Sequence, residues 1–149
     1  MIYILIAVGI FILEYSVKNW VEKTKPLGKP VDTKWKLLKI NRHHNRGTAG
    51  EKFVKNQGLI AIIALVFTFV CTVFFILTLG HSSNRFLKIG LAFLIGGAFS
   101  NTYDRLKRKY VVDYIQFQVP NKLSRYIFNL ADFAILIGAL LVGITMEHK

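Results

Sequence analysis

Four apolar runs dominate the pattern of hydrophobic and polar positions along the chain. They cover residues 1–13, 59–79, 86–99 and 126–144. A helix that crosses a bilayer needs roughly 17–25 mostly apolar residues. The second and fourth runs reach this length by themselves, whereas the first and third reach it only if the helix continues through their polar ends. We therefore expect those polar ends to lie at or inside the membrane interface.

The pattern predicts an all-α integral membrane protein with four transmembrane helices in a single membrane domain, residues 1–149. The expected spans are about residues 1–20, 57–80, 86–104 and 126–145, and a surface loop covers about residues 21–56. No Lys or Arg precedes the first run and no cleavage pattern of small residues follows it. We therefore interpret this run as a retained span and not as a signal peptide.

The first loop is too long to serve only as a connection. Its middle part shows an alternation of larger and charged side chains. The alternating positions are Val31, Thr33, Trp35 and Leu37. A period of two is typical of a strand with one exposed face. We expect a short strand or hairpin on the membrane surface, which would make this a small β-containing first loop.

Composition supports the membrane assignment. Hydrophobic residues make up 53% of the 149 residues, too large a share for an ordinary soluble domain of this size. The formal net charge is +12, and the positive residues lie in the loops between the expected spans. Attraction to anionic lipid headgroups explains this placement, and no nucleic-acid-binding pattern accompanies it. We expect membrane lipids as partners and no nucleic acid.

The alternating direction of four spans would bring the unusual polar residues to one side of the membrane. The end of the first span and the start of the second share a side, and so do the end of the third and the start of the fourth. The residues placed there are Glu14, Lys18, Asn101, Asp104, Arg105, Asp113, Asn129 and Asp132. An ionisable residue at membrane depth faces a partner, a cavity or a substrate, so this side is the candidate site.

Two helical spacings add detail to this expectation. Glu14 and Lys18 are four residues apart with the acid first, the favoured order for a helical ion pair. A plain structural pair at the interface would have the same spacing. Gly90 and Gly97 share one helical stripe with Asn101. Small residues on such a stripe let another helix approach closely.

Asp113 and Asp132 have the chemistry of a hydrolytic pair. Two aspartates close together cannot both ionise easily, so one keeps a proton while the other acts as a base on a shared water. Such a pair can cleave a peptide bond, because the acid polarises the carbonyl and then protonates the leaving amine. The alternative is two separate structural aspartates, each paired with Arg105 or Lys18. Asp104 is expected to pair with Arg105.

Five short blocks of sequence occur in a distinctive order. They are Glu14-Tyr-Ser-Val-Lys18, Asn45-Arg-Gly-Thr-Ala, Gly96-Gly-Ala-Phe-Ser-Asn-Thr-Tyr-Asp-Arg105, Val111-Val-Asp-Tyr and Phe128-Asn-Leu-Ala-Asp132. In this order the blocks resemble the lipoprotein signal peptidase family, signal peptidase II, of which the chain looks like a divergent member. The resemblance covers nearly the whole chain, and its last three blocks are specific in combination.

The resemblance implies that Asp113 and Asp132 are the two catalytic residues. It also implies a set of residues that shape the site or contact the substrate, namely Glu14, Lys18, Asn45, Gly47, Asn101, Arg105 and Asn129. The implied enzyme is a membrane aspartyl endopeptidase that removes signal peptides from diacylglyceryl-modified prolipoproteins, just before the lipidated cysteine. The lipidated prolipoprotein is then the substrate partner. We expect a monomer without a metal or organic cofactor, and adjacent His43 and His44 lack a third ligand for a metal.

The chain departs from the family pattern at three positions. The family usually has aspartate at the position of Glu14, glycine at that of Ser100, and an aromatic residue at that of Gly50. The two aspartate blocks are intact, so hydrolysis is still expected. The altered first-loop block affects the expected substrate preference.

Charge and resemblance disagree about orientation. All but three of the 20 Lys and Arg residues lie in or beside the first and third loops, and the positive-inside rule would place these loops in the cytoplasm. The family implies the opposite, with the active site near the outer face of the bacterial cytoplasmic membrane. We follow the resemblance, because a lipoprotein precursor is cut after export. The expected protein is multi-pass with an extracytoplasmic first loop.

Two other functions are compatible with parts of the pattern. One is a non-hydrolytic membrane paralogue that binds lipoproteins or lipids, which the intact aspartate blocks disfavour. The other is a small transporter-like protein whose carboxylates relay protons. A relay needs carboxylates at several depths of the bilayer, whereas these carboxylates gather at one face.

Overall fold

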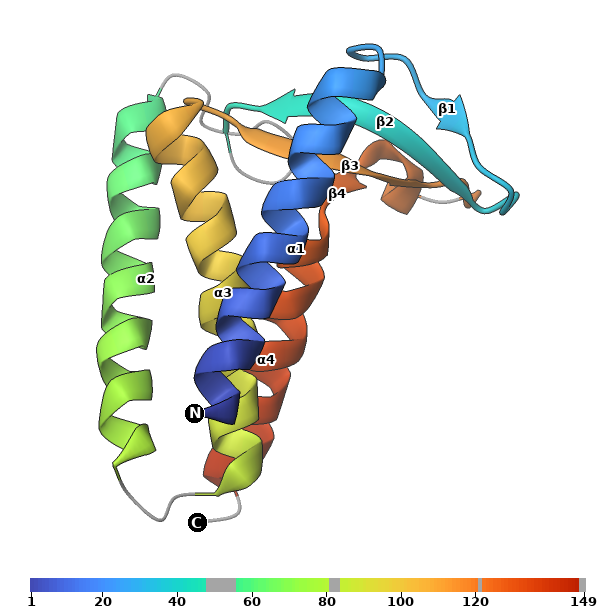
Figure 1. Ribbon diagram of the computed structural model, residues 1–149. Coiled ribbons are helices and arrows are strands. Elements are labelled where there is room, and N and C mark those ends of the chain that lie inside the picture. Colours follow the sequence, from blue (N-terminus) through green and yellow to red (C-terminus); the bar gives the residue numbers. More distant parts are fainter. Residues whose placement is uncertain (48–55, 81–83, 121, 148–149) are drawn as a thin grey trace.

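The computed structural model describes residues 1–47, 56–80, 84–120 and 122–147. Four helices form an elongated bundle with a small sheet across one end (Figure 1). Their bounds are α1 Ile2–Thr24, α2 Gln57–Leu79, α3 Arg85–Lys107 and α4 Leu130–Glu147. Helix α1 begins, and α4 ends, at the end of the bundle away from the sheet.

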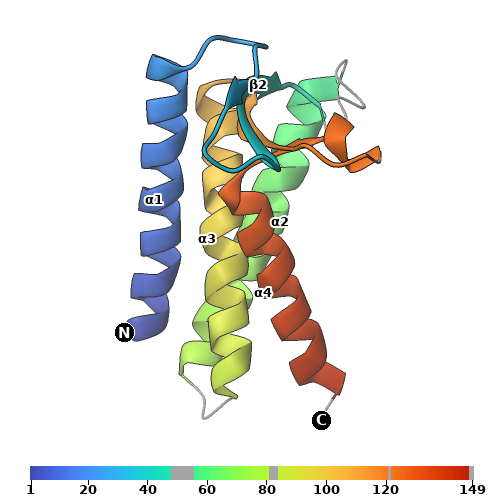
Figure 2. The same ribbon diagram turned by 90° about the vertical axis from the view of Figure 1, so that its right-hand side faces the viewer.

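Helix α3 is the centre of the bundle. It packs against each of the other three helices and has the most buried residues of the four. Figure 2 shows α3 between α1 and α4, with α2 behind it. This position explains how α3 accommodates Asn101, Asp104 and Arg105, because neighbouring elements supply polar partners where lipid would not.

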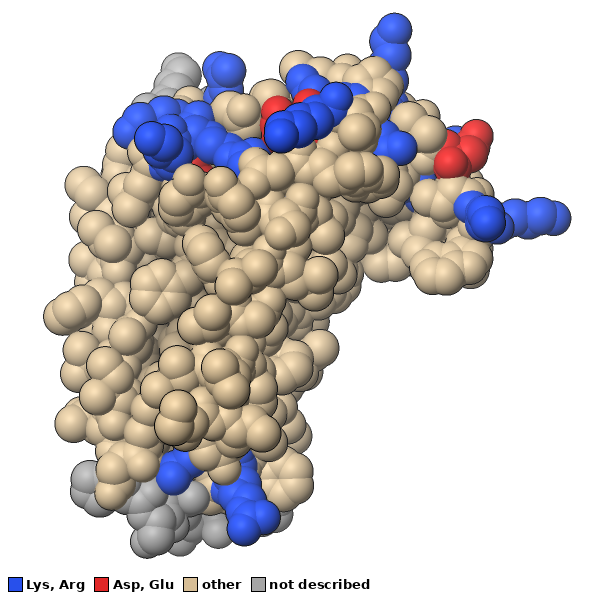
Figure 3. Space-filling view, in the orientation of Figure 1, with Lys and Arg blue, Asp and Glu red and all other residues tan. Residues whose placement is uncertain are grey.

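Two of the described helices, α1 and α2, are long and apolar enough to cross a membrane, with 23 residues each. The apolar part of α4, Leu130–Met146, is shorter. Figure 3 shows a broad band without Lys or Arg between the two ends of the molecule, and most of the visible charge lies at the sheet end. This distribution is typical of a surface embedded in a bilayer.

Small residues allow α3 and α4 to pack closely. A Cβ atom at Gly97 would lie 2.5 Å from the backbone oxygen of Ala131, and one at Gly138 would lie 2.5 Å from the backbone oxygen of Gly90. Atoms cannot approach so closely without displacement, so these positions accept only glycine in the present packing. The expected stripe of small residues is confirmed, and α4 is the helix that packs on it.

The sheet has four antiparallel strands in the order β1-β2-β3-β4. Their bounds are β1 Val31–Asp32, β2 Leu38–Asn45, β3 Val111–Phe117 and β4 Ile127–Phe128, with a short 3-10 helix, η2, at Lys122–Arg125. The first loop therefore supplies two strands, and the segment between α3 and α4 supplies the other two. The expectation of strands in the first loop alone is corrected by this finding.

The strand expected from the alternation after Val31 ends early. Thr33 Oγ1 accepts a hydrogen bond from the Trp35 backbone N–H at 3.1 Å and donates one to the Leu38 carbonyl at 2.7 Å. These bonds close a turn, so β1 stops at Asp32 and the next strand begins at Leu38. The expected hairpin is present, but most of the alternating residues form its turn.

Helix bounds differ from the expected spans most clearly at the fourth. Ile127 and Phe128 pair with β3, so α4 begins only at Leu130. Helix α3 continues to Lys107, beyond the expected end at residue 104. The extension of α3 includes Arg105 and Lys107, whereas the later start of α4 leaves Ile127 and Phe128 to the sheet.

Gly138→Ala is expected to destabilise the bundle, because the added methyl group would press on the backbone of α3. Such overpacking typically costs about 1–3 kcal/mol. Gly143→Ala is the matched control on the same helix, since a Cβ atom there meets nothing within 4 Å and alanine is the better helix former. Thermal unfolding in detergent should give a lower Tm for Gly138→Ala only. Equal Tm values for both variants would contradict the close packing of α3 on α4.

Candidate active site

The amino end of α4 is built by a reciprocal pair of hydrogen bonds. Asn129 precedes the helix, and its Oδ1 accepts from the Asp132 backbone N–H at 2.9 Å. Asp132 Oδ2 accepts in return from the Asn129 backbone N–H at 3.1 Å. This is the geometry of a capping box. It fixes the carboxylate of Asp132 at the first turn of the helix.

Two other elements satisfy the remaining N–H groups of that turn. The Leu130 N–H donates to the hydroxyl of Tyr114 at 3.3 Å, and the Ala131 N–H donates to Glu14 Oε1 at 3.2 Å. The Tyr114 hydroxyl in turn donates to Glu14 Oε2 at 2.6 Å. The start of α4 is thereby joined to α1 and to β3. Glu14 and Tyr114 are both buried.

Asp113 lies in the middle of β3 and is 3% exposed. Its Oδ2 accepts from Asn45 Nδ2 at 2.9 Å, and its Oδ1 accepts from Asn129 Nδ2 at 2.6 Å. Asn129 therefore contacts both aspartates, as the cap of Asp132 and as a donor to Asp113. The Gly47 N–H donates to Asn45 Oδ1 at 3.1 Å, which turns the Asn45 NH2 group toward Asp113.

Both aspartates line one cavity of about 240 Å³ at the sheet end of the bundle. Helix α3 contributes Asn101, whose Nδ2 donates to Asp132 Oδ1 at 3.0 Å, and Arg105. The complete lining is Asn45, Asn101, Arg105, Val111, Asp113, Tyr126, Ile127, Phe128 and Asp132. Residues of five elements, β2, α3, β3, β4 and α4, thus converge on two carboxylates.

The pKa of Asp113 is raised from its ordinary value near 4 to about 7. Burial is the main cause, and the negative charge of Asp132 is the second. The amide donors of Asn45 and Asn129 and the ammonium of Lys18 act in the opposite direction. Asp113 therefore keeps its proton at pH values where an exposed aspartate is ionised. Burial, followed by the charge of Glu14, also raises the pKa of Tyr114, so its hydroxyl stays neutral and can donate.

Lys18 lies behind this cavity and is 1% exposed. Its Nζ is 2.9 Å from Asp104 Oδ2, 2.9 Å from Asn101 Oδ1 and 3.1 Å from Ser100 Oγ. The expected pair with Glu14 is confirmed at a longer distance of 3.7 Å. The ammonium is therefore shared between α1 and α3.

The expected pairing of Asp104 with Arg105 is wrong. Asp104 pairs with Lys18 and, through its Oδ1, with Arg108 Nε at 3.1 Å. Consecutive residues of a helix point in different directions, whereas residues four apart share a face. Arg105 instead reaches the cavity that holds Asp113 and Asp132.

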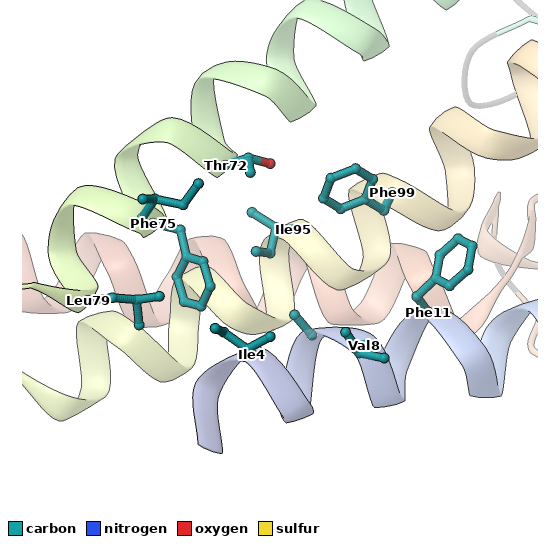
Figure 4. A pocket seen from close by; sticks show the side chains of 10 residues that line it. Ile4, Val8, Phe11, Thr72, Phe75, Leu79, Ile95 and Phe99 are labelled. Atoms are coloured by element: carbon teal, nitrogen blue, oxygen red, sulfur yellow. The ribbon is translucent and has the colours of Figure 1, made fainter. Parts of the chain in front are cut away.

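A larger hollow elsewhere has no acid–base groups. It has a volume of about 380 Å³ and lies between α1, α2 and α3, lined by apolar side chains such as Phe11, Ile95 and Phe99, with Thr72 (Figure 4). The Thr72 hydroxyl donates to the Thr68 backbone carbonyl. Size alone therefore does not mark the reactive site, because hydrolysis needs the polar groups of the smaller cavity.

The two adjacent histidines have separate structural surroundings. His44 Nε2 is 2.7 Å from Glu22 Oε1, and its ring stacks on Tyr110 at 3.8 Å between centroids. The backbone of His43 pairs with that of Asp113 in the sheet. Within the described ranges, no three His, Cys, Asp or Glu residues are grouped so that they could hold a metal ion.

Comparison with known proteins decides the family. The family model described as signal peptidase (SPase) II matches residues 6–147. The chain belongs to the signal peptidase II family. It is similar to the lipoprotein signal peptidases of Clostridium novyi (strain NT), at 30% identity over 98% of this chain and 97% of the relative, and of Mesorhizobium japonicum, at 36% identity over 94% and 82%.

Solved structures agree with this assignment. Two chains described as bacterial membrane enzymes match this signal peptidase II with TM-scores of 0.83 and 0.81, each at 28% identity. They cover 98% and 97% of the chain, which covers 87% and 91% of them. The protein is thus an aspartic-type peptidase of a bacterial membrane, with the fold of these enzymes.

The site residues implied by sequence fall into two groups in this signal peptidase II. Asp113, Asp132, Asn45, Asn101 and Arg105 line the cavity. The others lie behind them as hydrogen-bonding supports, namely Glu14, Lys18, Gly47 and Asn129. Gly50, one of the three departures from the family pattern, lies outside the described residues.

Sequence reasoning missed Tyr114 and the apolar wall of the cavity. Tyr114 follows Asp113 directly, and in a strand neighbouring side chains point to opposite faces. The hydroxyl of a tyrosine next to Asp113 was the available signal for a polar partner. Tyr126 and Phe128, which line the cavity, belong to a segment that was expected to be helical.

Trp35 and Leu37, two of the alternating positions of the first loop, lie in the turn between β1 and β2. Leu38 and Asn45 are the two ends of β2, so the strand separates that turn from Asn45 by about 23 Å at the usual rise per residue. Trp35 and Leu37 are exposed. Only Asn45 of this group reaches the cavity.

Asn45→Ala should raise the pKa of Asp113 above about 7, because the lost amide donor stabilises the ionised carboxylate. Carboxyl-carbon NMR during a pH titration measures this shift. Asn41→Ala is the matched control on the same strand, since its amide donates to Gln116 and not to Asp113. An unchanged Asp113 titration in Asn45→Ala would contradict the hydrogen bond assigned here.

Proposed function

We propose that Asp113 and Asp132 form the catalytic dyad with which this signal peptidase II removes signal peptides from prolipoproteins. The observation that carries this assignment is the position of Asn129, which hydrogen-bonds both carboxylates at the wall of one cavity. The relatives named above are lipoprotein signal peptidases. The bond to be cut is the one just before the diacylglyceryl-modified cysteine of the precursor.

The two carboxylates share one proton in the active state. Asp113, with its raised pKa, holds that proton below about pH 7. Asp132 accepts hydrogen bonds from Asn101 and from the Asn129 backbone at a helix amino end, and these contacts oppose the effect of burial on its ionised form. Because the pair is coupled, its titration belongs to the dyad and not to either residue alone.

Hydrolysis then follows the logic of a general acid and a general base. Asp132 takes a proton from water as the water oxygen bonds to the scissile carbonyl carbon, while Asp113 donates a hydrogen bond to the carbonyl oxygen. The tetrahedral intermediate collapses as the C–N bond breaks. The proton taken by the base goes to the leaving amine. Atoms balance with one water consumed for each bond cut.

The residues around the dyad have supporting roles in this proposal. Asn45 and Asn101 hold the carboxylates through their amide groups. The guanidinium of Arg105 can bind the substrate backbone or the ester oxygens of the substrate's diacylglyceryl group. Tyr126, Ile127 and Phe128 provide the less polar wall for the lipidated side of the substrate. We also propose a monomer as the active form.

The chain is proposed to span the bacterial cytoplasmic membrane four times as one domain, residues 1–149, with the sheet and the dyad near the outer face. The uncharged band between the charged ends in Figure 3 supports this arrangement. Central α3 needs less apolar composition than an isolated span, because the other helices cover much of it. Basic residues at the sheet end would contact anionic headgroups of the outer leaflet.

Asp113→Asn and Asp132→Asn should each reduce cleavage of a lipidated precursor by at least about 10³-fold, because either change removes one half of the acid–base pair. Purified variants incubated with the precursor are compared by the mass of the product. Asp32→Asn is the matched control, since Asp32 is 83% exposed and pairs only with Lys39 among the ion pairs of the described chain. Near-normal turnover of either dyad variant, with the protein folded, would refute the assignment.

The rate should fall as pH rises through and above about 7. The sign follows from the shared proton, because Asp113 loses it when the pH exceeds its raised pKa, and two ionised carboxylates leave no acid for the carbonyl. A pH–rate profile of kcat, with the folded state checked at each pH, measures this limb. A rate that stays constant up to pH 9 would show that the dyad does not need the proton.

A further inference from the structure

Three asparagine amides face the dyad, and each is oriented by a donor to its oxygen. Asn45 Oδ1 accepts from the Gly47 backbone N–H, and Asn129 Oδ1 accepts from that of Asp132. In both cases the NH2 group is turned toward Asp113. These two orientations depend on backbone groups, which side-chain substitutions elsewhere do not remove.

The third amide, Asn101, is oriented by a side chain. Its Oδ1 accepts from Lys18 Nζ at 2.9 Å, while its Nδ2 donates to Asp132 Oδ1 at 3.0 Å. An ammonium has donors and no acceptor, so it can face only the oxygen of the amide. The NH2 group must then face Asp132.

Lys18 is itself held without freedom to turn away. An ammonium has three N–H groups, and three acceptors lie within 3.1 Å of Nζ, on Asp104, Asn101 and Ser100. Ser100 occupies a position where the family pattern usually has glycine, so its hydroxyl supplies an acceptor that glycine lacks. The third N–H of the ammonium is thereby satisfied in this chain.

We propose that Lys18 is a positioning residue for the peptidase reaction, which acts through the Asn101 amide to keep a hydrogen-bond donor on Asp132. Ser100 and Asp104 hold the ammonium in place for this task. The inference rests on the proposed function of the dyad and adds a role to a residue outside the cavity lining. Lys18 does not touch the substrate in this account.

The charged surroundings give the expected direction of the pH effect. The groups that face this region are Glu14 and Lys18 from α1, Asp104, Arg105 and Arg108 from α3, Asp113 and Tyr114 from β3, and Asp132 from α4. Loss of the Lys18 cation removes a positive charge that favours ionisation of the nearby carboxylates. The rise of the rate on the acid side of the pH–rate profile and its fall on the alkaline side, the two limbs of the profile, should then both move to higher pH.

The test compares the double variant Lys18→Gln/Asp104→Asn with Asp104→Asn alone. The double change removes a cation and an anion together, so it avoids leaving one buried charge without its partner. A glutamine can present either a donor or an acceptor, so it no longer dictates how Asn101 turns. The expected result is a fall in kcat of roughly tenfold or more with little change in KM, and a shift of both limbs to higher pH. Asp104→Asn alone keeps the Lys18 cation, so it is the reference from which the fall in kcat and the shift of the limbs are measured.

Two further variants separate positioning from folding. In an Asn101→Ala background the double change should cause almost no additional loss of kcat, because the amide through which Lys18 acts is gone. Lys18→Arg keeps a cation with donors only and should retain most of kcat and the original limbs. An equal loss with and without Asn101, or limbs that do not move, would overturn the proposal.

A readout independent of activity follows the Asn101 amide directly. In protein labelled with 15N-asparagine, the side-chain NH2 signal that disappears in Asn101→Ala should respond to ionisation of the dyad in the parent and lose that response in the double variant. Failure of the parent protein to cut a lipidated precursor would refute the dyad assignment. The NH2 signal of Asn101 would still test how its amide is oriented. If Asp104→Asn folds but both Lys18 variants do not, Lys18 is a structural counter-ion and the proposal is wrong.

Discussion

The amino end of α4 starts inside the protein, and its first backbone N–H groups need acceptors there. A helix leaves these groups without partners of its own, and a buried unpaired N–H costs about 1–3 kcal/mol. The acceptors come from Tyr114 on β3, Glu14 on α1 and Asn129 just before the helix. One local requirement therefore ties together three elements that are far apart in the sequence. The placement of Asp132 follows from it, since Asp132 is part of the same cap.

The cost of this arrangement is a concentration of acidic groups. Four of the eight acidic residues of the chain, Glu14, Asp104, Asp113 and Asp132, lie in this small region. Lys18 lies between two of them, and Arg105 and Arg108 approach from α3. Burial without full compensation keeps one carboxyl protonated near neutral pH, as the raised pKa of Asp113 shows. This excess of buried acidic groups over cations is unfavourable for folding, but it supplies the protonated carboxyl that the reaction needs.

Close packing of α3 on α4 sets the geometry of the dyad support. Gly97 lies against Ala131, and one turn further along α3 Asn101 reaches Asp132, the residue after Ala131. A larger residue at position 97 would push the two helices apart and lengthen the bond between Asn101 and Asp132. The glycine at position 97 is thus required for the position of Asn101 as well as for helix packing.

Much of the organisation could be predicted from local patterns in the sequence. Run lengths of apolar residues indicated a membrane protein, the spacing of Gly90 and Gly97 indicated a close helix contact, and the spacing of Glu14 and Lys18 indicated their pair. The blocks around Asp113 and Asp132 indicated the family. Each of these signals lies within one helix or one short block, where periodicity reports which residues share a face.

Only the tertiary structure decided which distant residues meet. The sheet combines strands from two loops because β2 and β3 pair although α2 and α3 separate them in the sequence, and no pattern within β3 indicates its partner. Asp104 pairs with Lys18 and Arg108 and not with Arg105. The Tyr114 hydroxyl donates a hydrogen bond to Glu14, one hundred residues away in the sequence. The amide orientations depend on which donors are nearest in space. A linear sequence records the residue types that can make such contacts, whereas their distances arise only when the helices pack.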